Sequence, residues 1–264
     1  MRQYLFGFKL YFLHSFNFRF NTVINLVFGG LGLLITLFFW HLIYGGDMQK
    51  VLNGFTLSGV MTYFFIGSIF RPNYYPGFTF SGMIKTGTLG PALLKPRNIG
   101  LYVYFRNIAN VLTGMIPQAL FVIVLLPFAA RFLTWNLSAF GAVSLVLFFA
   151  VGTVSNFLVW SLVGYMAFWL EEAEAVMWSF AILCNLLTGF FIPLAFFPSW
   201  SVRILEMLPF ASWSYIPIMI YIGLYDAGMQ VFLLAVHLSW VAVLLLVNKI
   251  VWQRGVRNFT SVGG

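Results

Sequence analysis

The residues of this chain that could do chemistry are few and scattered. A phosphate-binding loop needs two glycines at Walker spacing followed by a lysine, and the segment Gly77-Phe-Thr-Phe-Ser-Gly82 has the glycines but is followed by Met83. Without that lysine, and without a soluble α/β domain around the segment, nothing cradles the β and γ phosphates. We therefore expect that the chain itself binds neither ATP nor Mg²⁺.

Other reactive side chains are equally isolated. His14, His41 and His237 stand alone, no HExxH or paired-cysteine spacing occurs, and no serine lies in a G-x-S-x-G elbow. The single cysteine, Cys184, can form no intramolecular disulfide. We predict no catalytic site and no metal site, which makes a membrane enzyme the weakest of the possible functions.

The amino-acid composition indicates which kind of secondary structure carries these residues. Of 264 residues, 61% are hydrophobic and 8% are charged, with a mean hydropathy of +0.94, so the chain is not a soluble domain. A bilayer core of about 30 Å needs roughly 20 apolar residues per helix. We predict an all-α integral membrane protein with six transmembrane helices. They are expected near residues 22–44, 53–70, 104–130, 138–168, 175–194 and 229–251.

The distribution of Lys and Arg predicts that both termini are cytoplasmic, because six spans return the chain to the side on which it began. Only Lys50, Arg131 and Arg203 fall on the other side. The residues on the cytoplasmic side are Arg2, Lys9, Arg19, Arg71, Lys85, Lys95, Arg97, Arg106, Lys249, Arg254 and Arg257. The net charge of +8 is then explained by topology and anionic lipid headgroups, without nucleic acid. We expect a multi-pass protein of the inner or plasma membrane.

Residues 1–264 are expected to form a single membrane domain, because no polar stretch is long enough to bury a core of its own. The first 21 residues alternate charges with aromatic rings and lack the apolar core of a signal peptide, which predicts an interfacial helix. A plain extension of the first spanning helix remains the alternative.

Two segments depart from the pattern of span and short loop. Residues 78–98 form a basic, Gly- and Pro-punctuated amphipathic segment that suits the docking of a soluble partner. Residues 195–224 are apolar, but Pro198, Pro209 and Pro217 interrupt them, which predicts short re-entrant helices on the outer side. An outer loop anchored at headgroup level by its Trp and Tyr residues is the alternative for the second segment.

Three local sequences resemble the permease subunits of ABC-2 type transporters, also called type V exporters. One is Gly87-Thr-Leu-Gly-Pro-Ala-Leu-Leu-Lys-Pro96 followed by Arg97. The second is Gly189-Phe-Phe-Ile-Pro193 leading into Phe196-Phe197-Pro198-Ser-Trp200, and the third is Leu208-Pro-Phe210. Their order and spacing make the resemblance, which covers nearly the whole chain.

The resemblance implies an N-terminal elbow helix, a cytoplasmic coupling helix after the second span, and re-entrant helices between spans five and six. It also implies a dimer of permeases, identical or different, with two ATP-binding subunits that hold ATP and Mg²⁺ and drive export. The residues expected to meet the ATP-binding subunit are Lys85, Thr88, Leu89, Leu93, Leu94, Lys95, Arg97, Glu171 and Glu172. The two glutamates could instead complement the dipole at the start of the fifth helix.

Ionisable residues are almost absent from the predicted spans, which disfavours ion-coupled transport. The candidates for the substrate pathway are Asn110, Asn156, Asn185, Thr188 and Phe191. A purely structural role as interhelical hydrogen-bonding groups remains open for the polar members of this set. Apolar and aromatic surroundings favour an amphipathic or hydrophobic cargo such as a drug, a peptide or a lipid. The alternative function is a membrane channel or scaffold that works without an ATPase.

Overall fold

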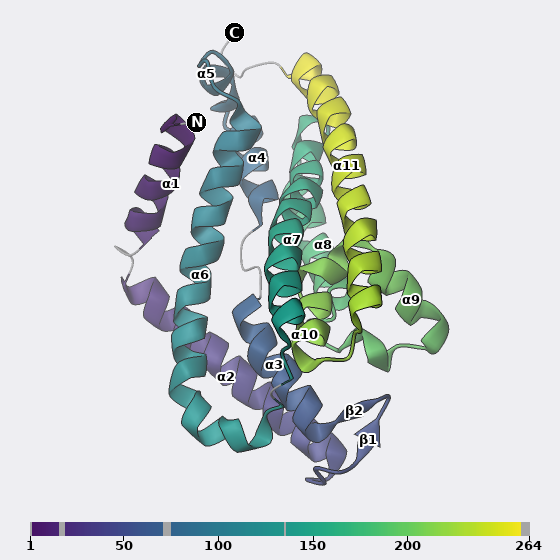
Figure 1. The fold of residues 1–264 in the computed structure, drawn as a ribbon. Coiled ribbons are helices and arrows are strands. Elements are labelled where there is room, and N and C mark those ends of the chain that lie inside the picture. Colours follow the sequence, from purple (N-terminus) through teal and green to yellow (C-terminus); the bar gives the residue numbers. More distant parts are fainter. Residues whose placement is uncertain (1, 16–18, 71–74, 135, 260–264) are drawn as a thin grey trace.

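The computed structural model describes residues 2–15, 19–70, 75–134 and 136–259, which form an almost entirely helical protein (Figure 1). The predicted all-α class is therefore confirmed. Among the described residues, four helices are long and apolar enough to cross a membrane. They are the Leu26–Tyr44 part of α2 (Arg19–Tyr44), α6 (Ile99–Ala129), α7 (Ala139–Tyr165) with the 3-10 turn η2 (Met166–Phe168), and α11 (Ala227–Asn258).

The other two predicted spans contain shorter apolar helices, α3 (Leu57–Phe70) and α8 (Ala173–Leu187). With 14 and 15 residues, these helices are about 21–23 Å long, less than the thickness of the bilayer core. Helix α8 ends early because the backbone at Gly189 turns into the left-handed region, with φ of +73°. Length alone thus identifies four of the six predicted crossings.

A small hairpin, which the sequence analysis did not anticipate, occupies the predicted start of the second span. It pairs β1 (Val51–Leu52) with β2 (Phe55–Thr56) in antiparallel register. Its turn residues, Asn53 and Gly54, have φ of +47° and +82°, as an Asn-Gly hairpin turn requires. The hairpin therefore delays the start of α3 to Leu57.

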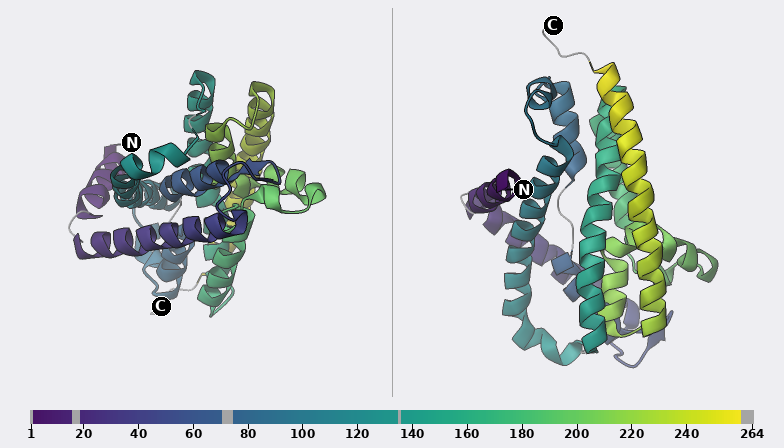
Figure 2. Two further views of the ribbon diagram at one scale, coloured as in Figure 1. Left: turned by 90° about the horizontal axis from the view of Figure 1, so that it is seen from below. Right: turned by 45° about the horizontal axis from the view of Figure 1, so that its top comes forward.

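Segment 78–98 folds as two helices, α4 (Pro76–Lys85) and α5 (Leu89–Leu93), followed by the start of α6. Helix α5 lies at the end of the molecule where α11 finishes, opposite the β hairpin (Figures 1 and 2). The amphipathic N-terminal stretch forms α1 (Arg2–Ser15), which packs on α6. Arg71 and residues 16–18 of the predicted interfacial helix lie outside the described residues.

Segment 195–224 folds into short helices, as its prolines predict. They are the end of η3 (Leu194–Phe196), α9 (Ser199–Met207), the 3-10 helix η4 (Pro209–Trp213) and α10 (Tyr215–Ile222). Pro198 and Pro209 stand at the starts of α9 and η4, but the break predicted at Pro217 is wrong. Helix α10 runs through Pro217 because this residue lies in the first turn, where a backbone N–H has no partner within the helix.

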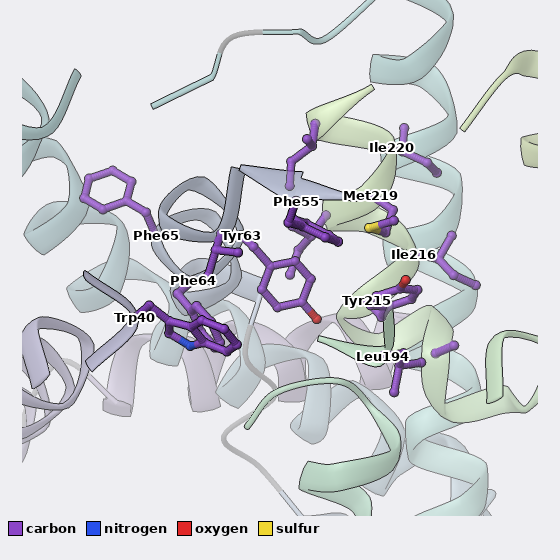
Figure 3. Packing of buried hydrophobic residues seen from close by; sticks show 14 of the residues in the cluster. Trp40, Phe55, Tyr63, Phe64, Phe65, Leu194, Tyr215, Ile216, Met219 and Ile220 are labelled. Carbon is purple, nitrogen blue, oxygen red and sulfur yellow. The ribbon is translucent and has the colours of Figure 1, made fainter. Parts of the chain in front are cut away.

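An aromatic core joins these short helices to α2 and α3 (Figure 3). Trp40 of α2 and Tyr63 of α3 are buried there, and the Tyr63 hydroxyl donates a hydrogen bond of 2.7 Å to the carbonyl of Gly189. Trp213 and Tyr215 are also buried, so these two rings pack inside the protein and do not anchor an outer loop in lipid headgroups.

Candidate functional site

Helix α4 is held against α7 by direct contact between backbones. A Cβ atom at Gly77 would lie 2.6 Å from the carbonyl oxygen of Trp160, and one at Gly164 would lie 2.5 Å from the carbonyl oxygen of Gly77. No side chain fits at either position, as at close helix contacts in membranes. Gly77, which gave the segment its likeness to a phosphate loop, is therefore a packing residue that seats α4.

The side chains of α5 and the residues after it divide into a buried and an exposed set. Leu89 and Ala92 are buried beneath the helix, whereas Leu94 is 88% exposed at its end. Thr88 and Lys95 are also exposed, Leu93 is 39% exposed, and Arg97 is half-buried with its guanidinium 4.0 Å from the centre of the Tyr102 ring. The surface formed by Thr88, Leu93, Leu94, Lys95 and Arg97, here called the α5 tip, combines apolar side chains with two cations.

Two of the predicted glutamates lie at the turn before α8, a helix that packs on α4. Glu171 and Glu172 are exposed. In the described part of the chain the ion pair joins Lys85 of α4 to Glu174, a residue outside the predicted set, with 3.7 Å between Lys85 Nζ and Glu174 Oε1. Because both side chains remain accessible to solvent, this pair contributes at most about 1 kcal/mol.

Helix α1 braces the segment that follows α5. The Tyr4 hydroxyl accepts a hydrogen bond of 2.9 Å from the backbone N–H of Asn98, and the hydroxyls of Tyr11 and Tyr102 lie 2.6 Å apart. The side chain of Asn98 in turn caps α6 by accepting from the N–H of Leu101. These contacts link the N-terminal helix to the α5 tip through the start of α6.

Asn156 of α7 lines two small cavities, each with a volume of about 20 Å³. Asn107 of α6 lines the first, and Asn185 and Thr188 at the end of α8 line the second. The structure thus brings together three of the predicted pathway residues, Asn156, Asn185 and Thr188. Asn110 lines neither cavity.

Several polar atoms around these cavities have no hydrogen-bond partner among the described residues. They are Oδ1 and Nδ2 of Asn107, Nδ2 of Asn156, Nε1 of Trp160 and Oγ of Ser214. All four side chains are at most 3% exposed. A buried polar group without a partner is destabilising by about 1–3 kcal/mol. Each cavity has room for about one water molecule, so a polar guest could satisfy these groups without displacing protein atoms.

A family model described as ABC-2 family transporter protein matches residues 31–263. The chain belongs to this family. No curated protein and no solved structure matches it. Together with the long apolar helices, membership makes the chain a multi-pass membrane permease, a component that in general works with an ATP-binding subunit. The resemblance seen in the sequence is confirmed.

A larger cavity of about 280 Å³ lies elsewhere in the permease, between α2, α3 and α6. Phe191, the last of the predicted pathway residues, lines it together with Phe190, Thr36 and Gln118. Phe191 is 51% exposed. The volume approaches the lower limit of about 300 Å³ typical of ligand pockets, so this cavity, unlike the pair around Asn156, is close to the size of a small ligand.

The permease also contains a buried carboxyl in segment 195–224, the segment predicted to form short re-entrant helices. Glu206 of α9 is 7% exposed, and its Oε1 accepts a hydrogen bond from the Tyr225 hydroxyl. Burial raises the pKa of Glu206 above its ordinary value, while Tyr225 and Arg203 act in the opposite direction. Only the fold brings the two side chains together, so no sequence signal could have found this contact.

Proposed function

We propose that this permease forms the transmembrane pathway of an ATP-driven exporter for an amphipathic or hydrophobic substrate. ATP and Mg²⁺ bind to a separate subunit, which acts on the permease through the α5 tip. Family membership and the form of the α5 tip support this function.

The exposure of Leu94 is the observation that carries the proposal. A lone exposed leucine is common on proteins, but this one stands 88% exposed beside Lys95, at the end of the molecule away from the β hairpin. An apolar pocket with an acidic rim would bury Leu94, and the cations would orient the approaching subunit. Lys85, Glu171 and Glu172 extend the same surface toward α8, and Leu89 fixes α5 from below.

The proposed orientation places the α5 tip, α1 and the end of α11 in the cytoplasm, because most Lys and Arg residues lie at this end. Both termini are then cytoplasmic. Helices α3 and α8 complete a set of six crossings with the residues that adjoin them. In this arrangement α1 is the elbow helix, and α9, η4 and α10 enter the membrane from the outer side.

The pathway itself is proposed to run past Asn156, Asn185 and Thr188, with Asn107 on its far side. Cavities of about 20 Å³ hold no amphipathic molecule, so the pathway must open by movement of α7 and α8 or between two permeases. We propose two permeases, identical or different, with two ATP-binding subunits. Amide groups next to Trp160 and Trp213 suit a substrate with both polar and apolar parts.

Purification from the native host in mild detergent tests this function. We expect a subunit with Walker motifs to accompany the permease, and the eluate to hydrolyse ATP in a vanadate-sensitive manner. Lys95→Glu should release that subunit, whereas Lys50→Glu, an exposed lysine beside the hairpin, should retain it. A permease that purifies alone and without ATPase activity would favour a channel or scaffold.

A further inference from the structure

A groove of about 540 Å³ opens at the α5 end of the molecule, distinct from the cavities around Asn156. It lies between the start of α6, the last turns of α7 and the last turns of α11. Apolar side chains form its walls, among them Leu101 of α6, Val154 and Leu158 of α7 and Leu245 of α11. Leu101 and Leu245 are about half exposed, at 46% and 53%.

Two cations are among the residues that line this groove. Arg97 and Lys249 both line it, and within the described ranges neither forms an ion pair with a carboxylate. The Nε atom of Arg97 is buried and, among the described residues, has no hydrogen-bond partner. Trp252, an amphipathic ring of the kind found where membranes meet water, also lines the groove.

Asn248 adds a fixed acceptor next to Lys249. Its Nδ2 donates to the carbonyls of Leu158 and Leu244, at 3.1 and 2.8 Å, which locks the amide in place. The Oδ1 atom has no hydrogen-bond donor in the part of the chain that the structure describes. The residue is only 8% exposed, so bulk water does not readily supply one. A hydroxyl or ammonium group in the groove would satisfy this oxygen.

We propose that this groove binds one anionic phospholipid. The phosphate lies between Arg97 and Lys249, a headgroup donor reaches Asn248, and an acyl chain follows the apolar walls. On α7 the lining runs from Val154 to Tyr165, a stretch of 12 residues that rises by roughly 16 Å, which is close to half of a bilayer core. The groove therefore matches one leaflet of the membrane in length, apolar character and charge.

This inference needs only a membrane-embedded chain and does not rest on the transport role. The test titrates the purified chain with phosphatidylglycerol or with phosphatidylcholine of the same acyl chains, and counts bound lipids by native mass spectrometry. We expect one saturable phosphatidylglycerol per chain and weaker phosphatidylcholine binding. Lys249→Gln should weaken phosphatidylglycerol binding about fivefold. Lys9→Gln, which removes an exposed cation of α1 outside the groove, should leave it unchanged.

A second variant fills the groove and keeps both cations. Leu245→Trp places a large ring at a half-exposed wall position and should abolish the saturable site for both lipids. Three results would each overturn the proposal. The first is equal binding of the two lipids, and the second is an equal loss of phosphatidylglycerol binding in Lys249→Gln and Lys9→Gln. The third is normal lipid binding by Leu245→Trp. Cross-linking of Leu245→Cys to an ATP-binding subunit would also overturn it, because a protein would then occupy the groove.

Discussion

At Gly164 the backbone of α7 touches the backbone of α4, and this contact predicts a large effect of one methyl group. Gly164→Ala should lower the free energy of unfolding by about 1–3 kcal/mol, because the added Cβ overlaps Gly77. Gly82→Ala is the matched control, since a Cβ there meets nothing within 4 Å. A thiol-reactive fluorophore measures both, because the single cysteine, Cys184, is buried until the protein unfolds. Equal stability of the two variants would contradict the contact.

Glu206 predicts a pH dependence of stability. Because burial raises its pKa above the ordinary value of 4.5, the folded protein holds this proton more tightly than the unfolded chain does. The resulting stabilisation is complete below pH 4.5 and is lost as the pH rises through the folded-state pKa. Thermal unfolding followed by circular dichroism should show this decline, and Glu206→Gln should flatten it. A Glu206→Gln variant that keeps the wild-type slope would refute the assignment.

Substitution of Asn107 tests whether this residue lines the substrate pathway or only stabilises the packing of helices. Both polar atoms of its side chain lack partners among the described residues, so Asn107→Leu should raise the free energy of unfolding by about 1 kcal/mol. Transport or substrate-stimulated ATPase activity should fall, because the cavity loses a polar group. Asn98→Ala, which removes a helix cap, should lower stability by about 1 kcal/mol instead. A destabilised Asn107→Leu variant would show that this amide holds helices together.

At the scale of elements, the ion pair between α4 and α8 predicts a clear result in a charge swap. The Lys85–Glu174 pair is accessible to solvent and adds little stability, so its loss alone should not detach an ATP-binding subunit. Lys85→Glu should weaken binding of that subunit because it reverses a charge on the docking surface. Adding Glu174→Lys should restore the internal pair but not the binding, as measured by copurification. Full rescue by the double variant would show that Lys85 acts only within the permease.

The sequence predicts elements well where the signal is local. Continuous apolar stretches locate the long helices, the prolines predict short helices in segment 195–224, and Gly, Pro and Lys mark the α4–α5 region. Two deviations are also local in origin, because Asn53-Gly54 builds a hairpin and Gly189 ends α8 early. Contacts between distant residues are different. The burial of Glu206 by Tyr225 and the position of Asn107 opposite Asn156 depend on how helices pack, which periodicity does not specify.

At the scale of the whole molecule, the proposed docking surface and the proposed substrate pathway lie in different environments. The α5 tip lies at the end of the molecule where α11 finishes, whereas the cavities around Asn156 are lined by residues of α6, α7, α8 and η4. The Gly77–Gly164 contact connects them, since α4 bears Lys85 at one end and touches α7 at the other. A movement of the docked subunit would therefore reach α7, and Asn156, through α4.

Cysteine cross-linking at the α5 tip tests most directly whether the ATP-binding subunit docks on this surface. The Leu94 side chain is 88% exposed, whereas Cys184, the natural cysteine, is buried. In the Leu94→Cys variant the introduced thiol is therefore the one that can react with an ATP-binding subunit. We predict that Leu94→Cys cross-links to a Walker-bearing ATP-binding subunit, that vanadate changes the yield, and that Val51→Cys at the hairpin gives no such product. Equal cross-linking at both positions, or none at Leu94→Cys in a complex that still hydrolyses ATP, would contradict docking through α5.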